Sequence, residues 1–116
     1  MSKVNVNMNA RPVEKNAFVI DIVGEVNSFA ENSLMDAYTE ASSAGAKAII
    51  LNFSGLDYMN SSGIGLLVTL LIRVKRQGQR LLACGLSDHY RQIFALTRLN
   101  EAILEFPDEQ AALADL

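Results

Sequence analysis

Two serines and two glycines stand together in the stretch Asn60-Ser61-Ser62-Gly63-Ile64-Gly65, between an apolar run and a segment with helical periodicity. If a helix begins here, its unpaired N–H groups and the positive end of its dipole favour an anion at this point. The chemistry that suits this arrangement is phosphorylation of Ser61, whose phosphate would lie over the helix N-terminus. Ser61 could equally be a simple N-cap, a common role for serine. Ser62 is the second candidate acceptor, with a hydroxyl that should be less exposed because it lies further into the helix.

The same stretch lacks what other serine or glycine chemistry requires. A hydrolase needs a base and a Gly-x-Ser-x-Gly elbow, but His89 is the only histidine and the elbow is absent. Gly63-Ile64-Gly65 lacks the further glycine and lysine of nucleotide-binding loops. Asp57 and Glu25 are two scattered carboxylates, which do not make a metal signature. The sequence therefore predicts no catalytic residue, no cofactor and no metal ion.

Size and composition indicate one globular domain. The 116 residues, 50% hydrophobic and 20% charged, fit a single core spanning residues 1–116. The net charge of −3 and a single basic run, Arg73-Val74-Lys75-Arg76, argue against nucleic-acid binding, and these cations suit the dipole of a helix end instead. No apolar run approaches the roughly 20 residues of a spanning helix, and Met1–Asn9 shows no leader pattern, so we expect a soluble cytoplasmic protein without membrane insertion. The lone Cys84, within an apolar run, should be a small buried hydrophobe.

Alternating and continuous apolar runs predict the strands of the first half. Val4, Val6 and Met8 alternate with polar residues up to an interruption at Arg11-Pro12. Ala17–Val23 is rich in β-branched residues and follows closely enough for an antiparallel hairpin. The continuous apolar run at residues 48–53 predicts a central strand that is covered on both faces and ends at Ser54-Gly55.

Helical spacing predicts two long helices. Ser28 and Glu31 match a capping box, and the periodic segment that follows ends at Gly45. A second helix runs from Ser61 to a stop at Gly78. Its predicted apolar stripe consists of Ile64, Leu67, Val68, Leu71 and Val74.

The last third predicts a further alternation of strands and helices. Leu81–Cys84 reads as a strand, Ser87 as the N-cap of a short helix, and Ile103–Phe106 as an edge strand. Pro107 should open a final helix. The expected fold is therefore a single α/β domain, with about four helices and a mixed, mostly parallel sheet of four to five strands.

Residues 60–65 resemble the Asp-Ser-Ser/Thr-Gly-Leu/Ile/Met-Gly signature of the anti-sigma factor antagonists, the bacterial members of the STAS domain family. The turn at Gly24–Asn27 and the order of the predicted elements extend this resemblance over nearly the whole chain. It implies that the protein is not an enzyme and that the loops at Gly24–Asn27 and at Ser61 form one surface. That surface should include the partner-binding residues Asn27, Ser28, Tyr58, Asn60, Ser61, Ser62 and Gly63.

The resemblance also implies a partner-switching cycle. The unmodified antagonist would capture an anti-sigma factor that is itself a serine kinase, and so release the sigma factor. That kinase would phosphorylate Ser61 and end the capture, and a serine phosphatase would reset the switch. The alternative is a constitutive, unphosphorylated STAS module, such as a scaffold subunit of a signalling or transport assembly.

Two positions depart from the family pattern, and three others have two interpretations. Acidic residues are common in the family where this chain has Asn27 and Asn60, which keep hydrogen bonding but lack the charge. Tyr58 and Met59 are either interface anchors or packing residues. Gly65 could allow close helix packing on the sheet or close approach of a partner.

Overall fold

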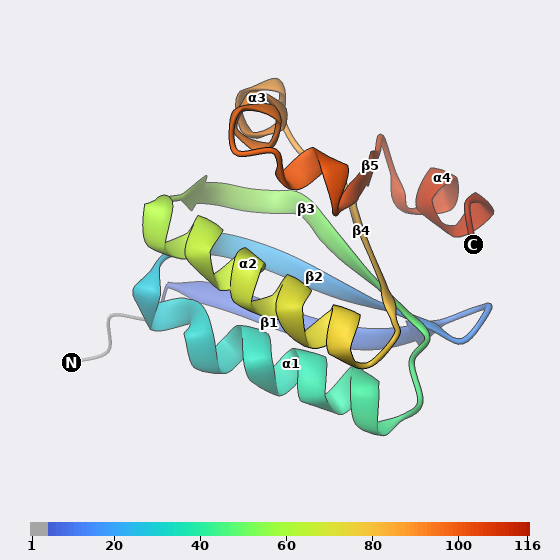
Figure 1. Ribbon diagram of the computed structural model, residues 1–116. Coiled ribbons are helices and arrows are strands. Elements are labelled where there is room, and N and C mark those ends of the chain that lie inside the picture. Colours follow the sequence, from blue (N-terminus) through green and yellow to red (C-terminus); the bar gives the residue numbers. More distant parts are fainter. Residues whose placement is uncertain (1–4) are drawn as a thin grey trace.

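The computed structural model describes residues 5–116, in which three helices cover one face of a five-stranded sheet and a fourth covers part of the other (Figure 1). The strands lie in chain order from β1 to β5, with β1 antiparallel to β2 and all other neighbours parallel. The predicted mixed α/β sheet is confirmed, while the predicted strand residue Val4 lies outside the described residues. The elements are β1 Val6–Val13, β2 Ala17–Val26, a 3-10 turn η1 Ser28–Ala30, α1 Glu31–Ser43, β3 Ala48–Met59, α2 Ser61–Arg76, β4 Arg80–Cys84, α3 Asp88–Leu96, a 3-10 turn η2 Leu99–Glu101, β5 Leu104–Phe106 and α4 Glu109–Ala114.

The β1–β2 hairpin forms as predicted, but its first strand is longer. The predicted interruption at Arg11-Pro12 is wrong, because Arg11 pairs with Val19 and Pro12 with Phe18 inside the ladder. Proline is tolerated because β1 is an edge strand and has a partner on one side only. The chain reverses at residues 14–16, where Lys15 and Asn16 take positive φ values of 62° and 57°.

β3 is also longer than predicted, and this extension carries the chain to the serine stretch. The run does not end at Ser54-Gly55 but continues to Met59. Beyond Asp21 and Asn52 the register between β2 and β3 shifts twice, and pairing then resumes with Glu25 opposite Tyr58 and ends with Val26 opposite Met59. Such irregularities bend a strand without ending it.

The predicted capping box at the start of the first helix is wrong. Asn27, not Ser28, accepts a hydrogen bond from the Phe29 backbone N–H at 2.9 Å and begins η1. α1 follows from Glu31 after Ala30, which supplies no side-chain cap. The predicted stops after α1 and α2 are confirmed, since Gly45 and Gly78 adopt φ values of 89° and 67°.

The buried face of α2 is rotated relative to the predicted stripe. Gly63, Leu67, Leu70 and Val74 are buried, whereas Val68 is 41% exposed. Leu70 was missed and Val68 was wrongly included because most residues from Ile64 to Val74 are apolar, so the pattern does not fix the helix rotation. The helix carries hydrophobic residues on its outward side as well.

Two apolar layers hold the sheet. The larger layer lies under α1, α2 and α3, where Phe53 of β3 meets Phe94 of α3 edge to face with ring centroids 6.1 Å apart. The smaller lies under α4, where Ala112 packs with Ala17, Ile50 and Cys84. The prediction that β3 is covered on both faces is confirmed, and Cys84 is a buried hydrophobe at 1% exposure.

The last two helices are close to prediction. Ser87 caps α3 by accepting a hydrogen bond from the Tyr90 N–H at 3.4 Å. The final helix is capped by Asp108, whose carboxylate accepts from the Ala111 N–H at 2.8 Å, so Pro107 precedes the helix and does not open it. No helix among residues 5–116 combines the length and the hydrophobicity that crossing a membrane requires.

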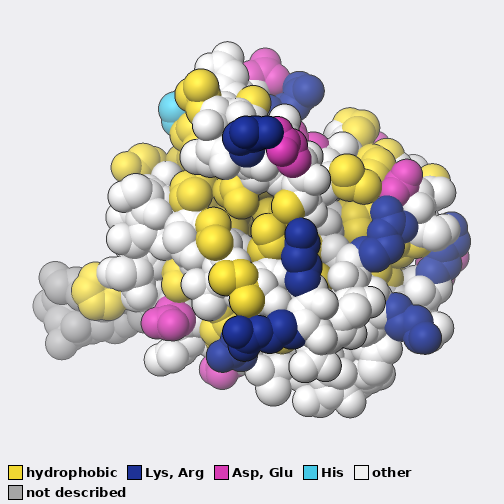
Figure 2. Space-filling view, viewed as in Figure 1, with side chains coloured by type: hydrophobic (Ala, Val, Ile, Leu, Met, Phe, Trp, Pro, Cys, Tyr) yellow, Lys and Arg dark blue, Asp and Glu magenta, His cyan; other side chains and the backbone are white. Residues whose placement is uncertain are grey.

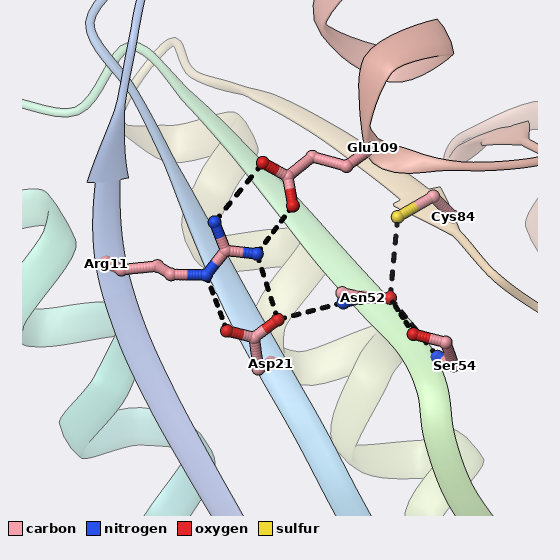
Figure 3. A network of polar contacts seen from close by, with 6 residues as sticks. All are labelled: Arg11, Asp21, Asn52, Ser54, Cys84 and Glu109. Atoms are coloured by element: carbon pink, nitrogen blue, oxygen red, sulfur yellow. Dashed lines mark hydrogen bonds and ion pairs between the residues drawn. The ribbon is translucent and has the colours of Figure 1, made fainter.

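A polar network ties β1, β2, β3 and α4 together on the sheet face that α4 covers (Figure 3). Arg11 donates to Asp21 at 2.6 Å and also pairs with Glu109 of α4. Asn52 donates to the second oxygen of Asp21 at 2.8 Å. The hydrogen bonds from Arg11, above all, lower the pKa of the Asp21 carboxyl below its usual value. The network therefore fastens a short C-terminal helix to the N-terminal hairpin.

Candidate functional site

Ser61 is the first residue of α2 and its side chain is exposed. The residue before it, Asn60, has extended backbone and is the N-cap: its side-chain oxygen accepts the Gly63 N–H at 3.0 Å. The simple N-cap interpretation of Ser61 is therefore wrong, because Asn60 performs that role. The Ser61 hydroxyl remains available at the positive end of a 16-residue helix.

The backbone around Ser61 and Ser62 suits an anion. Neither N–H group has an acceptor among residues 5–116, as expected for the first turn of a helix. Ser62 is exposed as well, so burial does not separate the two candidate acceptors as expected. What favours Ser61 is its position next to the cap at the helix start.

The two glycines of the motif have different structural roles. Gly63 is buried, and a Cβ there would lie 2.7 Å from Met59 Cγ and closer still to the carbonyl oxygen of Val26. Gly63 thus lets the helix start pack against the ends of β2 and β3. Gly65 is exposed and a Cβ would meet nothing within 4 Å, so the packing interpretation of Gly65 is wrong.

The Gly24–Asn27 turn lies beside the serine stretch, as the resemblance implied. Val26 pairs with Met59, and its carbonyl accepts the Asn60 N–H at 3.2 Å. Asn27 follows directly and Ser28 is exposed in η1, which contacts α2. The structure thus brings together the two loops that carry the seven predicted partner-binding residues.

Aromatic residues at the site divide into exposed and structural ones. Tyr58 is 53% exposed, so it is not a packing residue, whereas Met59 is 4% exposed and is one. Phe29 of η1 is 57% exposed and was missed, although an aromatic residue just after a turn was the signal that could have found it. Tyr90 of α3 accepts the Met59 N–H through its hydroxyl at 2.8 Å and so holds the end of β3 in place.

The two amides that depart from the family pattern are both helix caps. Asn27 caps η1 and Asn60 caps α2, each through its side-chain oxygen. A carboxylate would make the same hydrogen bonds, so what the amides change at Ser61 is charge. Within the described part of the chain, no group of three or more His, Cys, Asp or Glu side chains is placed to hold a metal ion.

The STAS domain model matches residues 9–112 of the chain. The protein belongs to the STAS domain family. An anti-sigma-B factor antagonist of Staphylococcus aureus is 26% identical over 96 residues, which cover 82% of this chain and 89% of that protein. The chain thus has relatives named as anti-sigma factor antagonists over most of its length.

Solved structures show the same fold. An anti-sigma factor antagonist from Mycobacterium paratuberculosis is 15% identical with a TM-score of 0.82, covering 98% of this chain and 96% of that one. The Bacillus cell fate determinant SpoIIAA in its phosphorylated form is 24% identical with a TM-score of 0.71, covering 94% of this chain and 99% of that one. The predicted STAS-like fold is therefore confirmed, with five strands where four to five were predicted.

Proposed function

We propose that this STAS protein is an anti-sigma factor antagonist that acts by partner switching. The unphosphorylated form binds an anti-sigma factor with serine kinase activity and releases the sigma factor. Phosphorylation of Ser61 blocks that binding, and a serine phosphatase reverses it. The protein itself is a cytoplasmic regulator and not an enzyme.

One observation carries this proposal: Ser61 is exposed at the first position of α2, within the family motif, while its neighbour Asn60 caps the helix. A kinase can reach the hydroxyl without unfolding the helix start. Phosphorylation adds about −1.5 to −2 charges, and the helix N-terminus stabilises them. The fold can therefore stay unchanged while the surface loses its affinity for the partner.

Surrounding residues support a shared surface. Tyr58 and Phe29 are both more than half exposed on the elements that flank the start of α2. Exposed aromatic side chains are typical anchors of protein interfaces. With Asn27, Ser28, Asn60 and Ser62, they surround the point where the phosphate would be added, and the buried Gly63 lies beneath that surface.

The test begins with phosphorylation. The protein is incubated with ATP and the serine-kinase anti-sigma factors of its own organism, and modification is mapped by mass spectrometry. We expect one phosphoryl group, lost in Ser61→Ala and retained in Ser62→Ala. A phosphoryl group that persists in Ser61→Ala and disappears in Ser62→Ala would move the site to Ser62.

Binding measurements complete the test. Ser61→Ala should bind the kinase like the wild type, and Ser61→Asp should bind at least about tenfold more weakly because it adds a negative charge. Equal affinity of the wild type and Ser61→Asp would contradict the switch.

A constitutive scaffold is the second candidate, and the amides at 27 and 60 are the observation that favours it. If the kinase recognises carboxylates there, this chain would bind partners without being phosphorylated. No modification by any of the kinases, with partner binding unaffected by ATP, would support the scaffold. Faster phosphorylation of Asn60→Asp would assign the difference to the missing charge.

A further inference from the structure

The outward face of α2 carries hydrophobic residues that the fold does not use. Ser61, Gly65, Val68 and Ile72 follow one another at spacings of four, three and four residues, which places them on one side of the helix. Val68 is 41% exposed and Ile72 is 49% exposed. We call these four residues the outward stripe. They lie opposite the buried residues Gly63, Leu67, Leu70 and Val74.

Gly65 makes a notch in the outward stripe. Glycine is among the least favourable residues inside a helix, and here no internal contact requires it, because a Cβ would meet nothing within 4 Å. The missing side chain leaves the backbone open between Ser61 and Val68. A second helix crossing at this point could approach more closely than over a larger residue.

Positive charge lies at the other end of the stripe. Lys75 and Arg76 are exposed in the last turn of α2 and, within residues 5–116, neither is within 4 Å of a carboxylate. Phe29 of η1, which contacts α2, adds an exposed aromatic ring. Figure 2, viewed from the side of α1 and α2, shows hydrophobic side chains gathered on this face with Lys and Arg side chains beside them. The surface is therefore apolar along its length and basic at one end.

We propose that the outward stripe is the docking surface for one acidic amphipathic helix of the anti-sigma factor. Its apolar face would cover Val68 and Ile72, its backbone would cross at Gly65, and its carboxylates would meet Lys75 and Arg76. A helix suits this surface because the stripe is a row of side chains interrupted at Gly65, where a second helix can cross closely. An acidic helix suits it because Lys75 and Arg76 have no carboxylate partner within the described part of the chain.

This inference rests on the proposed function and explains how one phosphate could end binding. Ser61 lies on the same line as the hydrophobic contacts, one helical turn before the notch. A phosphate there would place a doubly charged, strongly hydrated group beside the point where the partner helix crosses. Lys75 and Arg76 lie at the other end of α2, so burying this phosphate in the interface would leave it without a countercharge and would disfavour the complex. The stripe would be the contact surface, and Ser61 would be the point at which the contact is controlled.

The experiment measures the affinity of the intact protein for the anti-sigma factor that binds the wild type, by calorimetry. Ile72→Asp and Gly65→Leu should each weaken binding at least about tenfold, the first by charging the apolar contact and the second by filling the notch. Gly65→Ala, a smaller change, should have a smaller effect. The matched control is Leu96→Asp, because Leu96 is 84% exposed but lies on α3, and its affinity should stay within about twofold of the wild type.

The contribution of Lys75 and Arg76 can be measured through the rate at which the protein associates with the anti-sigma factor. The double variant Lys75→Gln/Arg76→Gln should slow association several-fold, on the order of three to ten, and flatten its dependence on salt, since charges at an interface rim act mainly on the association rate. Unchanged association kinetics would overturn the acidic character of the partner helix.

The outcomes separate this inference from the proposed function. If the wild type is bound and phosphorylated at Ser61 but the stripe variants bind equally well, the docking surface is wrong and the switch stands. If no kinase binds or modifies the wild type, the switch fails and the inference fails with it. Binding to phosphatidylglycerol vesicles that is lost in Ile72→Asp, with kinase affinity unchanged, would assign the stripe to a membrane surface and overturn the proposal.

Discussion

At the scale of single residues, Asn27 and Asn60 cap their helices as the family's acidic residues could, but they carry no negative charge. Asn60 accepts the Gly63 N–H at 3.0 Å, which a carboxylate could also do. Asn60→Ala should lose about 1 kcal/mol of unfolding free energy because the cap disappears. Asn60→Asp should keep the cap and gain about 0.3 to 1 kcal/mol from the helix dipole. Urea unfolding of both variants measures this, and equal stability of Asn60→Ala and the wild type would contradict the assigned cap.

Replacing each glycine of the motif by alanine should change the unfolding free energy in opposite directions. Gly63→Ala should lower the unfolding free energy by about 1 to 3 kcal/mol, because its Cβ would overlap the Val26 backbone and Met59. Gly65→Ala should raise it by up to about 1 kcal/mol, because alanine favours the helix and nothing stands in the way. Denaturant midpoints and slopes of the two variants decide this. A stabilised Gly63→Ala would show that the helix start is not closely packed.

At this scale the sequence predicted which residues meet, but not how each one is used. The resemblance to the STAS family implied that Asn27 and Ser61 would share a surface, and in the structure the parallel strands β2 and β3 bring them to the same edge of the sheet. The sequence could not separate Gly63 from Gly65, since burial depends on the rotation of α2. The exposure of Phe29 likewise depends on η1, a 3-10 turn that the capping prediction missed.

At the scale of elements, α4 is held by its contacts and not by its own helical tendency. Six residues are too few for a stable isolated helix, and Ala112 is the one that is fully buried against the sheet. Ala112→Asp should place a carboxylate in this apolar layer and detach α4. Ala114→Asp, at an exposed position of the same helix, is the control and should leave α4 in place.

The reactivity of the Cys84 thiol measures whether α4 has detached from the sheet. Cys84 packs in the same layer as Ala112, and burial raises the pKa of its thiol to about 11. The wild type and Ala114→Asp should react slowly with a thiol reagent at pH 8, and Ala112→Asp should react at least about tenfold faster. A fast reaction in the wild type would show that α4 does not shield the thiol.

Element boundaries were predictable where local chemistry decides them and unpredictable where pairing does. The glycine stops of α1 and α2 and the Ser87 cap were predicted because each depends on one or two neighbouring residues. β1 and β3 were predicted too short, because Pro12 and Gly55 are breakers by type and only their place in the sheet makes them tolerable. The irregular pairing of β2 with β3 had no sequence signal.

At the scale of the whole molecule, the Arg11–Asp21–Glu109 network connects the N-terminal hairpin with the C-terminal helix. The pKa of Asp21 is lowered from 3.8, chiefly by hydrogen bonds from Arg11. As the pH falls, the Asp21 carboxylate is therefore protonated at a higher pH in the unfolded chain than in the folded protein. The stabilisation is complete above pH 3.8 and is lost as the pH drops through the lower folded-state pKa.

Asp21→Asn tests this linkage. At neutral pH the variant should lose about 1 to 2 kcal/mol of unfolding free energy, a range reduced for partial exposure of the network. The difference from the wild type should shrink as the pH falls below 3.8. Urea unfolding across pH measures this, with the exposed Asp57→Asn as the control. A difference that stays constant in acid would mean that Asp21 acts by packing alone.

The two sheet edges bear on how this protein avoids aggregation. An unprotected edge strand is a template for strands from other molecules. Here Pro12 removes a donor from the β1 edge, and the opposite edge, β5, is only three residues long. Because α2 exposes the hydrophobic side chains of Val68 and Ile72, edges that resist strand addition limit one route to aggregation. Pro12→Val should therefore leave the fold intact and shorten the lag time of aggregation under agitation.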